Sequence, residues 1–397
     1  MKLEYILIFG AGVILIGIGI FYQINAQPLS KDKVIKHLEN YFEKAAVPGE
    51  AFSGIQVLVY SEEKDIDWRL GSGRSSGNPN HQLEANQPFH VASIGKLFTA
   101  TLGMMLSEEG KLKLSDPISM YLDKEVLEGL FIYNNIDYQK EVTLEQLLAH
   151  TSGAADYFED PVKSGKTMPE LIVSEPDTIW SPDTLLDFSR KNQSSLGAPG
   201  NAFHYSDTGY ILLGLMIEEI EKKPFHEVLN DRIFAPLKMN DSYMVLRSEP
   251  KSLPKKSIAD IWFQNTEISR NNSISADWSG GGIISTPEDL LSFQKALHAG
   301  ELINKDSLST LFSIQHKFQN GIYYGLGTME IHFEDFLFLL KGMPRVVGHI
   351  GILSTHLFYD PETKTHIIMN FGSDTKMEHS FKALIEVINV LKRIKTE

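Results

Sequence analysis

The sequence predicts an α+β fold in which both ends of the chain build one antiparallel sheet and a mainly helical lobe is inserted between them. Strand-pair patterns occur near each terminus, whereas apolar residues at helical spacing dominate the middle. An amphipathic run at each end could cover the sheet. We expect the sheet lobe over about residues 30–90 and 280–397, and the helical lobe over about 91–279.

The elements near the N-terminus are a helix and a hairpin. The run 31–45 has an apolar stripe of helical period, and Ser30 before it is suited to an N-cap. The apolar stretches 54–60 and 66–70 then flank a polar turn, Ser61-Glu62-Glu63-Lys64. This arrangement predicts a β-hairpin.

The elements near the C-terminus are a hairpin followed by a helix. The stretches 352–359 and 365–371 flank Asp360-Pro361-Glu362-Thr363, which predicts a second hairpin. An apolar stripe over 381–391 predicts a closing helix. The two hairpins can therefore join edge to edge into one sheet.

The middle of the chain is predicted to be mostly helical. Thr143 and Gln146 form a capping box, which marks the start of a helix. The runs 210–220 and 288–298 carry apolar residues at helical spacing. Loops rich in Gly, Pro, Ser and Asn lie between these runs and are long enough to shape a pocket.

Composition excludes several classes of function. With 42% hydrophobic residues among 397, the chain can bury a large core, and 37 basic against 51 acidic residues give a net charge of −14. No basic cluster interleaved with aromatics appears, so we expect no nucleic acid partner. The chain has no cysteine and no metal-binding spacing of histidines, so we expect neither metal nor cofactor. No pattern specifies an oligomeric state.

The N-terminal segment is predicted to meet a membrane. Lys2 precedes an unbroken apolar or glycine run over residues 5–22. This run exceeds the ~7–15 residues of a secretory core and reaches the lower end of the ~17–25 residues that span a bilayer. Residues 1–29 are therefore expected to be a membrane anchor, or a signal peptide if cleaved near Ala26. In both cases the domain over 30–397 is expected to be exported, either held at the membrane or released to the periplasm or the medium.

The pattern Ser-x-x-Lys occurs seven times, and its context selects one occurrence. Only Ser93 follows a strand-like stretch and opens an apolar helix. A helix starting there would place the hydroxyl over unpaired N–H groups and bring Lys96 to the same spot one turn on. We predict Ser93 as a nucleophile and Lys96 as its proton acceptor. The other six patterns, in loops, caps or a helix interior, start at Ser30, Ser61, Ser248, Ser252, Ser292 and Ser373.

Two distant segments could complete such a site. Tyr205, just before a predicted helix, could be a second proton-transfer group. The strand predicted to begin at Ile352 offers a backbone N–H opposite that of Ser93, which would complete an oxyanion hole. His150 is better interpreted as a hydrogen-bonded structural residue than as a catalytic one. Asp277 is predicted either to touch substrate or to pack.

These segments together resemble the class C β-lactamase and penicillin-binding protein superfamily of serine hydrolases. The signatures of that superfamily are Ser-x-x-Lys, Tyr-x-Asn and Lys-Thr-Gly or His-x-Gly, and their counterparts at Ser93, Tyr205 and His349 stand here in the same order. Residues 147–153 and 280–290 are similar to further segments of that superfamily. The resemblance spans residues 31–394. It implies a β-lactamase/transpeptidase-like fold.

The resemblance also implies roles for the matching residues. Ser93 would form the acyl-enzyme, Lys96 and Tyr205 would be the proton-transfer pair, and the N–H groups of Ser93 and Ile352 would form the oxyanion hole. Either Lys96 or Tyr205 could be the base for acylation. Gly351 of the third signature is expected to lie at the substrate.

The sequence departs from the superfamily pattern at two positions. Asp207 stands where lactam-cleaving members usually carry an amide, and a carboxylate near Lys96 would favour the charged form of that lysine. Asp207 is predicted to contact substrate or to cap a helix. His349 replaces the lysine of the third signature, which removes a permanent positive charge from a position expected to bind substrate.

The predicted function is an exported serine hydrolase that cleaves an ester or amide through a Ser93 acyl-enzyme. A carboxylester or a D-amino-acid peptide is the expected small-molecule or peptide substrate. A β-lactamase or D-alanyl-D-alanine carboxypeptidase is the alternative within the same chemistry. A membrane-tethered binding or sensing protein of the same fold, without turnover, is the alternative from another class.

Overall fold

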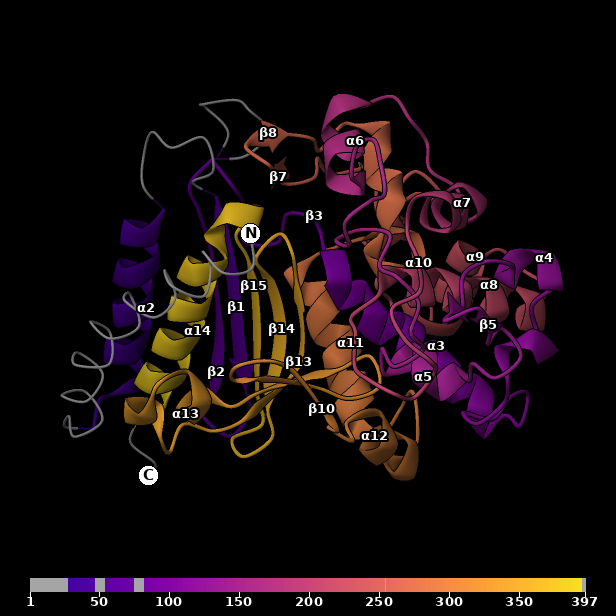
Figure 1. Ribbon diagram of the computed structural model, residues 1–397. Helices are drawn as coiled ribbons and strands as arrows, with labels where there is room; N and C mark the ends of the chain where they lie inside the picture. Colours follow the sequence, from indigo (N-terminus) through magenta and orange to yellow (C-terminus); the bar gives the residue numbers. More distant parts are fainter. Residues whose placement is uncertain (1–27, 47–53, 75–81, 254, 395–397) are drawn as a thin grey trace.

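An eight-stranded antiparallel sheet lies beside a helical lobe in the computed structural model, which describes residues 28–46, 54–74, 82–253 and 255–394 (Figure 1). This architecture confirms the predicted α+β fold class. The predicted membrane anchor or signal peptide falls almost entirely in residues 1–27, which lie outside the described residues. In the part of the chain that the structure describes, no helix has the length and apolar character needed to cross a membrane.

Strands from the two ends of the chain pair with each other near one edge of the sheet. The N-terminal hairpin, β1 (Ile55–Ser61) and β2 (Ile66–Ser72), pairs through β1 with β15 (Thr365–Asn370), and Val57 lies opposite Met369. The strand order is β10-β11-β12-β13-β14-β15-β1-β2. Both predicted hairpins are therefore confirmed. The remaining strands are β10 (His316–Gln319), β11 (Ile322–Tyr324), β12 (Met329–Ile331), β13 (Val346–Gly351) and β14 (Thr355–Asp360).

Two features of the sheet differ from the sequence prediction. The strand expected from Ile352 begins at Thr355, because residues 352–354 form the turn between β13 and β14. Strands β10 to β13 were not predicted, and they extend the sheet beyond β14. Strands β10 to β12 have only three or four residues each, which is too short for a strand period to stand out in the sequence.

Helices α2 (Lys31–Ala45) and α14 (Met377–Leu391) cover one face of the sheet (Figure 1). Helix α2 buries Val34, Leu38 and Phe42, which are spaced four residues apart and so lie on one side of the helix. Burying each such side chain contributes roughly 1.5–3 kcal/mol. The apolar stripes that predicted both helices are thus the faces that pack on the sheet.

Helix α11 (Pro287–Ala299) packs on the other face and separates the sheet from the helical lobe (Figure 1). Thr286 caps its first turn, and Gly300 ends it with a φ of +79°, a conformation that glycine adopts without strain. In the lobe, α3 (Gly95–Glu108), α8 (Asp207–Glu221) and α10 (Trp278–Gly281) contact one another.

Smaller elements fill the rest of the described chain. A second sheet consists of the short strands β3 (Phe89–His90), β6 (Tyr243–Met244) and β9 (Ile283–Ser285). Two further pairs of strands are β4 (Ile132–Tyr133) with β5 (Ile136–Asp137), and β7 (Trp262–Phe263) with β8 (Thr266–Glu267). The helices are α4 (Lys124–Leu127), α5 (Leu144–Leu148), α6 (Met168–Ser174), α7 (Pro182–Asn192), α9 (Phe225–Leu229), α12 (Lys305–Leu311) and α13 (Phe333–Phe336). The predicted capping box at Thr143 begins α5 and is confirmed.

Buried histidines should make the fold sensitive to acid. His356, between β14 and α14, bonds Ser380 through Nε2 at 2.7 Å, and burial lowers its pKa to about 3. An unfolded histidine titrates near ~6.5, so between these values the unfolded chain binds more protons and stability falls as pH falls. We expect the melting temperature to decrease below pH ~6.5. His356→Gln should show a smaller decrease in calorimetry from pH 7 to pH 4.5.

The control is His226→Gln, which removes a half-exposed histidine from α9. This variant should keep the pH dependence of the parent protein. The same pH slope in His356→Gln as in the parent would contradict the assignment of acid sensitivity to this buried ring.

Candidate active site

Ser93 lies in a tight turn that presents its side chain from a buried segment. The predicted helix does not start at Ser93; Ala92–Ile94 form a 3₁₀ turn, and α3 begins at Gly95. From Gln87 to Met104, Ser93 is the one residue that is not buried. The fold therefore leaves Ser93 partly exposed while burying its neighbours on both sides.

A buried histidine supports the turn before Ser93. Ala92 has a φ of +51°, which is unfavourable for a residue with a Cβ and needs support from its surroundings. The Ala92 N–H donates to His90 Nδ1 at 3.1 Å, and the His90 ring is buried. Sequence reasoning missed this role, because His90 lies in an otherwise apolar stretch that predicts only a strand.

Lys96 is fully buried and uses all three protons of its ammonium group. Its Nζ lies 3.0 Å from Ser93 Oγ and 3.1 Å from the Gly280 carbonyl oxygen, and it forms an ion pair with Asp207. Burial alone would lower the pKa of Lys96, but Asp207 and Asp277 outweigh it and the pKa lies above its usual value. The resting site therefore holds a charged lysine against Ser93.

The glycine run at 280–282 allows α10 to approach α3 closely enough for Lys96 to reach the Gly280 carbonyl oxygen. A Cβ added to Gly95 would lie 2.7 Å from Gly281 Cα, so the backbones of α3 and α10 touch. The same approach brings the Asp277 carboxyl close to Lys96. Burial raises the pKa of Asp277 to about 7, Lys96 opposes the rise, and Asp207 adds to it.

Asp207 faces Lys96 from the first turn of α8. It is buried, and its backbone N–H donates to Asp156 Oδ1 at 3.0 Å. Ser206 occupies the N-cap position, so the capping alternative for Asp207 is not what the structure shows. A role in substrate binding stays a prediction.

Tyr205 is brought to the same place by the segment before α8. The Lys96 Nζ lies 5.1 Å from the centre of the half-buried Tyr205 ring. Burial raises the pKa of Tyr205 well above its usual value, the Asp207 charge adds to the rise, and hydrogen bonding with Ser93 opposes it. Ser93, Lys96 and Tyr205 thus form one cluster.

The end of β13 completes the cluster from the sheet side. Gly351 packs so closely that an added Cβ would lie 2.7 Å from the Val91 carbonyl oxygen and 2.8 Å from Ala92 Cβ. Thr355 Oγ1 donates to the same Val91 oxygen at 2.8 Å. Ile352 follows Gly351 and is partly exposed. The contribution of its N–H to an oxyanion hole stays a prediction.

His349 points into the protein rather than into open space. It is fully buried, with Nε2 3.1 Å from Tyr324 Oη and Nδ1 2.6 Å from the Ile350 carbonyl oxygen. Burial lowers the pKa of His349 to about 3, and the Lys96 charge acts in the same direction. The ring is therefore uncharged at neutral pH. Its predicted contact with substrate stays a prediction.

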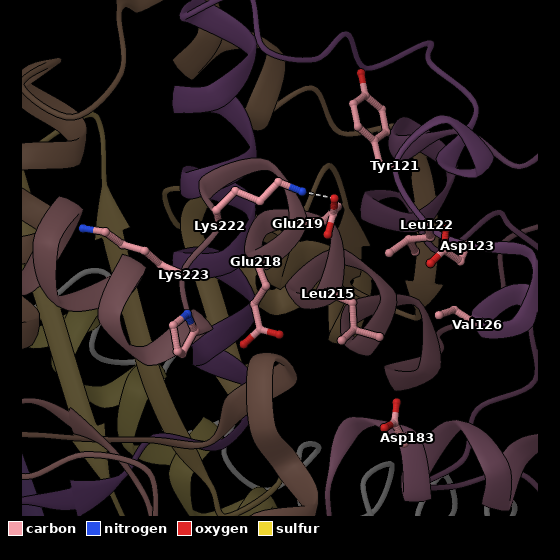
Figure 2. Close-up of a pocket in the computed structure, with 11 residues that line it drawn as sticks. Tyr121, Leu122, Asp123, Val126, Asp183, Leu215, Glu218, Glu219, Lys222 and Lys223 are labelled. Atoms are coloured by element: carbon pink, nitrogen blue, oxygen red, sulfur yellow. Dashed lines mark hydrogen bonds and ion pairs between the residues drawn. The ribbon is translucent and has the colours of Figure 1, made fainter.

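A separate hollow lies in the helical lobe, away from these residues. It measures about 470 Å³ and is lined by the 121–126 segment, Asp183 and the C-terminal half of α8 with Lys222 and Lys223 (Figure 2). None of the predicted site residues lines it. Among the described residues, no group of three or more His, Cys, Asp or Glu side chains could hold a metal ion.

Comparison with known proteins assigns the family. The sequence model of the Beta-lactamase family matches residues 38–388. The chain belongs to this family. It is therefore a serine hydrolase of the β-lactamase and penicillin-binding protein superfamily, as the sequence predicted.

Individual members of the superfamily match most of the chain. Penicillin-binding protein 4* of Bacillus subtilis (strain 168) is 27% identical over 371 residues, which cover 89% of this chain and 75% of that protein. A D-stereospecific amidohydrolase from Streptomyces sp. has a TM-score of 0.71 at 25% identity, covering 88% of this chain and 97% of the other. A D-amino acid amidase from Ochrobactrum anthropi SV3, complexed with D-phenylalanine, has a TM-score of 0.73 at 20% identity, covering 90% and 99%.

Removing the Asp207 charge should make Lys96 easier to deprotonate. The Asp207→Asn variant keeps the shape of the side chain, but removes an adjacent opposite charge that typically shifts a pKa by roughly 1–3 units. We expect the rate of Ser93 labelling by a fluorophosphonate to reach its half-maximum at a pH lower by about that amount. Labelling rates measured from pH 5 to pH 10 test this expectation.

Glu219→Gln is the matched control, because it removes an exposed carboxylate from an ion pair with Lys222 on the same helix. Its pH profile should equal that of the parent protein. A profile of Asp207→Asn that stays in place or moves to higher pH would show that Asp207 does not hold Lys96 in its charged form.

Proposed function

We propose that this protein is an exported serine hydrolase that cleaves an ester or amide through an acyl-enzyme on Ser93. The single observation that carries the proposal is the 3.0 Å contact between Lys96 Nζ and Ser93 Oγ, inside a segment where only Ser93 reaches the surface. A hydroxyl held against a buried amine is the arrangement that an activated serine needs.

In the proposed reaction, the pair formed by Lys96 and Tyr205 first loses one proton to solvent. Ser93 Oγ then bonds to the acyl carbon while its own proton passes to the deprotonated pair. The N–H groups of Ser93 and Ile352 stabilise the oxyanion that develops. The pair then returns the proton to the leaving alcohol or amine, and water releases the acyl group by the same steps. Because the pKa values of Lys96 and Tyr205 both lie above their usual values, acylation should accelerate with rising pH.

The substrate class that we propose is a carboxylester or a D-amino-acid amide or peptide. Likeness to the D-stereospecific amidohydrolase and the D-amino acid amidase supports the second of these. The uncharged, buried His349 supports substrates that need no cation for a free carboxylate.

Two other functions each have an observation in their favour. A β-lactamase or D-alanyl-D-alanine carboxypeptidase activity is supported by the likeness to penicillin-binding protein 4*. A membrane-tethered binding or sensing role without turnover is supported by the ion pair that holds Lys96 charged. We place the lactam alternative second because Asp207 and the uncharged His349 depart from the lactam-cleaving pattern. We place the sensing role third because Ser93 is partly exposed and contacts Lys96.

We also propose that residues 1–29 direct the domain over residues 30–397 out of the cytoplasm. The apolar run over residues 5–22 supports either a retained anchor or a cleaved signal peptide. Fractionation of cells that express the full chain, with N-terminal sequencing of the mature protein, distinguishes these two outcomes.

The Ser93→Ala variant tests the proposed reaction. We expect hydrolysis of p-nitrophenyl esters and of D-amino-acid amides to fall by at least about a thousandfold, as in other systems with an activated serine. A fluorophosphonate should label the parent protein, and peptide mapping should locate the adduct on Ser93. Labelled penicillin, used in parallel, separates the lactam alternative from the proposed substrate class.

Ser292→Ala is the matched control, since Ser292 also starts a Ser-x-x-Lys pattern but bonds the Glu288 carbonyl oxygen within α11. It should keep parental activity. Equal rates for Ser93→Ala and the parent would overturn the hydrolase proposal. A stable penicillin adduct without ester or amide turnover would instead favour the sensing role.

A further inference from the structure

Three buried rings behind the site form a continuous hydrogen-bonded chain. His150 Nε2 lies 3.0 Å from Tyr324 Oη, and the same oxygen lies 3.1 Å from His349 Nε2. Each of the three side chains is at most 1% exposed. They come from three distant elements: His150 from the loop after α5, Tyr324 from β11 and His349 from β13.

The outer partners of the two histidines fix where each proton lies. The Ser206 N–H donates to His150 Nδ1 at 3.0 Å, so a neutral His150 carries its proton on Nε2. The Ile350 carbonyl oxygen can only accept, so His349 carries its proton on Nδ1 and leaves Nε2 as an acceptor. Burial lowers the pKa of both histidines, and Lys96 lowers both further, so both rings are neutral at neutral pH.

Tyr324 links the two histidines into one chain of hydrogen bonds. Its hydroxyl accepts from His150 and has one proton. We assign that proton to His349 Nε2, because no other donor bonds that nitrogen among the described residues. Burial raises the pKa of Tyr324 well above its usual value, so the proton stays on the oxygen. The Tyr210 hydroxyl also hydrogen-bonds with Tyr324, but its own proton goes to the Leu148 carbonyl oxygen. The chain therefore runs in one direction from Ser206 to Ile350.

Both ends of the chain lie next to groups of the proposed reaction. Ser206 directly follows Tyr205, and the His150 ring stacks on the Tyr205 ring at 4.1 Å between centres. Ile350 lies in the last part of β13, two residues before Ile352. A hydrogen-bonded connection thus joins the lobe that carries the phenol to the strand that leads to the oxyanion N–H.

We propose that Tyr324 is a positioning residue, whose hydroxyl holds the Tyr205 segment and the end of β13 in the relative placement that acylation of Ser93 needs. This inference rests on the proposed function. In it, His349 serves as the far anchor of the chain, a role that the lysine of the alternative third signature could not fill with an acceptor nitrogen. Tyr324 is fully buried and its hydroxyl bonds both histidines, so we expect it to act through them and not on substrate.

Tyr324→Phe tests the proposal, because it keeps the ring and removes only the hydroxyl. Misplacing reacting groups by about 1 Å can cost ~100-fold in rate. We expect kcat for the ester or amide substrate to fall roughly 10- to 100-fold, with KM within about threefold of the parent value. The rate of fluorophosphonate labelling of Ser93 should fall by the same factor as kcat.

Tyr323→Phe is the matched control from the same strand. Tyr323 donates to Asp335 at 2.6 Å on the half-exposed side of β11, so this variant also loses one tyrosine hydrogen bond. It should keep parental kcat and KM. A Tyr324→Phe variant that is folded and retains parental kcat would overturn the positioning role, as would an equal loss in both variants.

Histidine tautomers give a readout that does not depend on activity. Nitrogen-15 NMR of the parent protein at pH 7 should show His150 protonated on Nε2 and His349 protonated on Nδ1, both neutral. A charged ring, or the opposite tautomer at either residue, would overturn the chain even if Ser93 reacts. If Ser93→Ala keeps full activity while both tautomers are found as expected, the proposed function fails and the hydrogen-bonded chain stands.

Discussion

The buried ammonium group of Lys96 is the interaction on which the rest of the site depends. An ammonium without solvent must give each of its protons to an acceptor, since an unpaired buried charge is very costly. Here the acceptors are Ser93 Oγ, the Gly280 carbonyl oxygen and the Asp207 carboxylate. They belong to three separate segments, so satisfying one charge requires the helical lobe to close around α3.

Backbone contacts without side chains make that closure possible. Gly95 meets Gly281 where α3 and α10 touch, and Gly351 meets Ala92 where β13 reaches the Ser93 turn. A side chain at any of these glycines would push a neighbouring segment away by several tenths of an ångström or more. The short distances around Ser93 are therefore set by absent side chains as much as by the polar groups themselves.

The sequence predicts the elements whose apolar residues recur at a regular spacing and the site residues that belong to one short motif. The two hairpins and α14 have strong apolar patterns, and Ser93 with Lys96 is a motif read within one turn. Tyr324 could not be found in this way, because it lies in a three-residue strand and its partners, His150 and His349, are 174 and 25 residues away. The environment of His349 was likewise hidden, since only the folded chain shows that both of its nitrogens face protein.

The charges around Lys96 have a further consequence for the acyl donor. Asp207 and Asp277 both act on a single ammonium, and Asp156 lies behind Asp207, whose backbone N–H it accepts. Burial raises the pKa of Asp156 well above its usual value and that of Asp277 to about 7. The site therefore keeps protons on some of its carboxyl groups near neutrality, because a second unpaired negative charge would be unfavourable there. A substrate carboxylate close to Ser93 would add a further negative charge and would be unfavourable for the same reason. The third signature of this chain has the uncharged His349 in place of a lysine, so it provides no positive charge to offset that carboxylate. The electrostatics of the site thus favour an acyl donor that is neutral next to the bond to be cleaved.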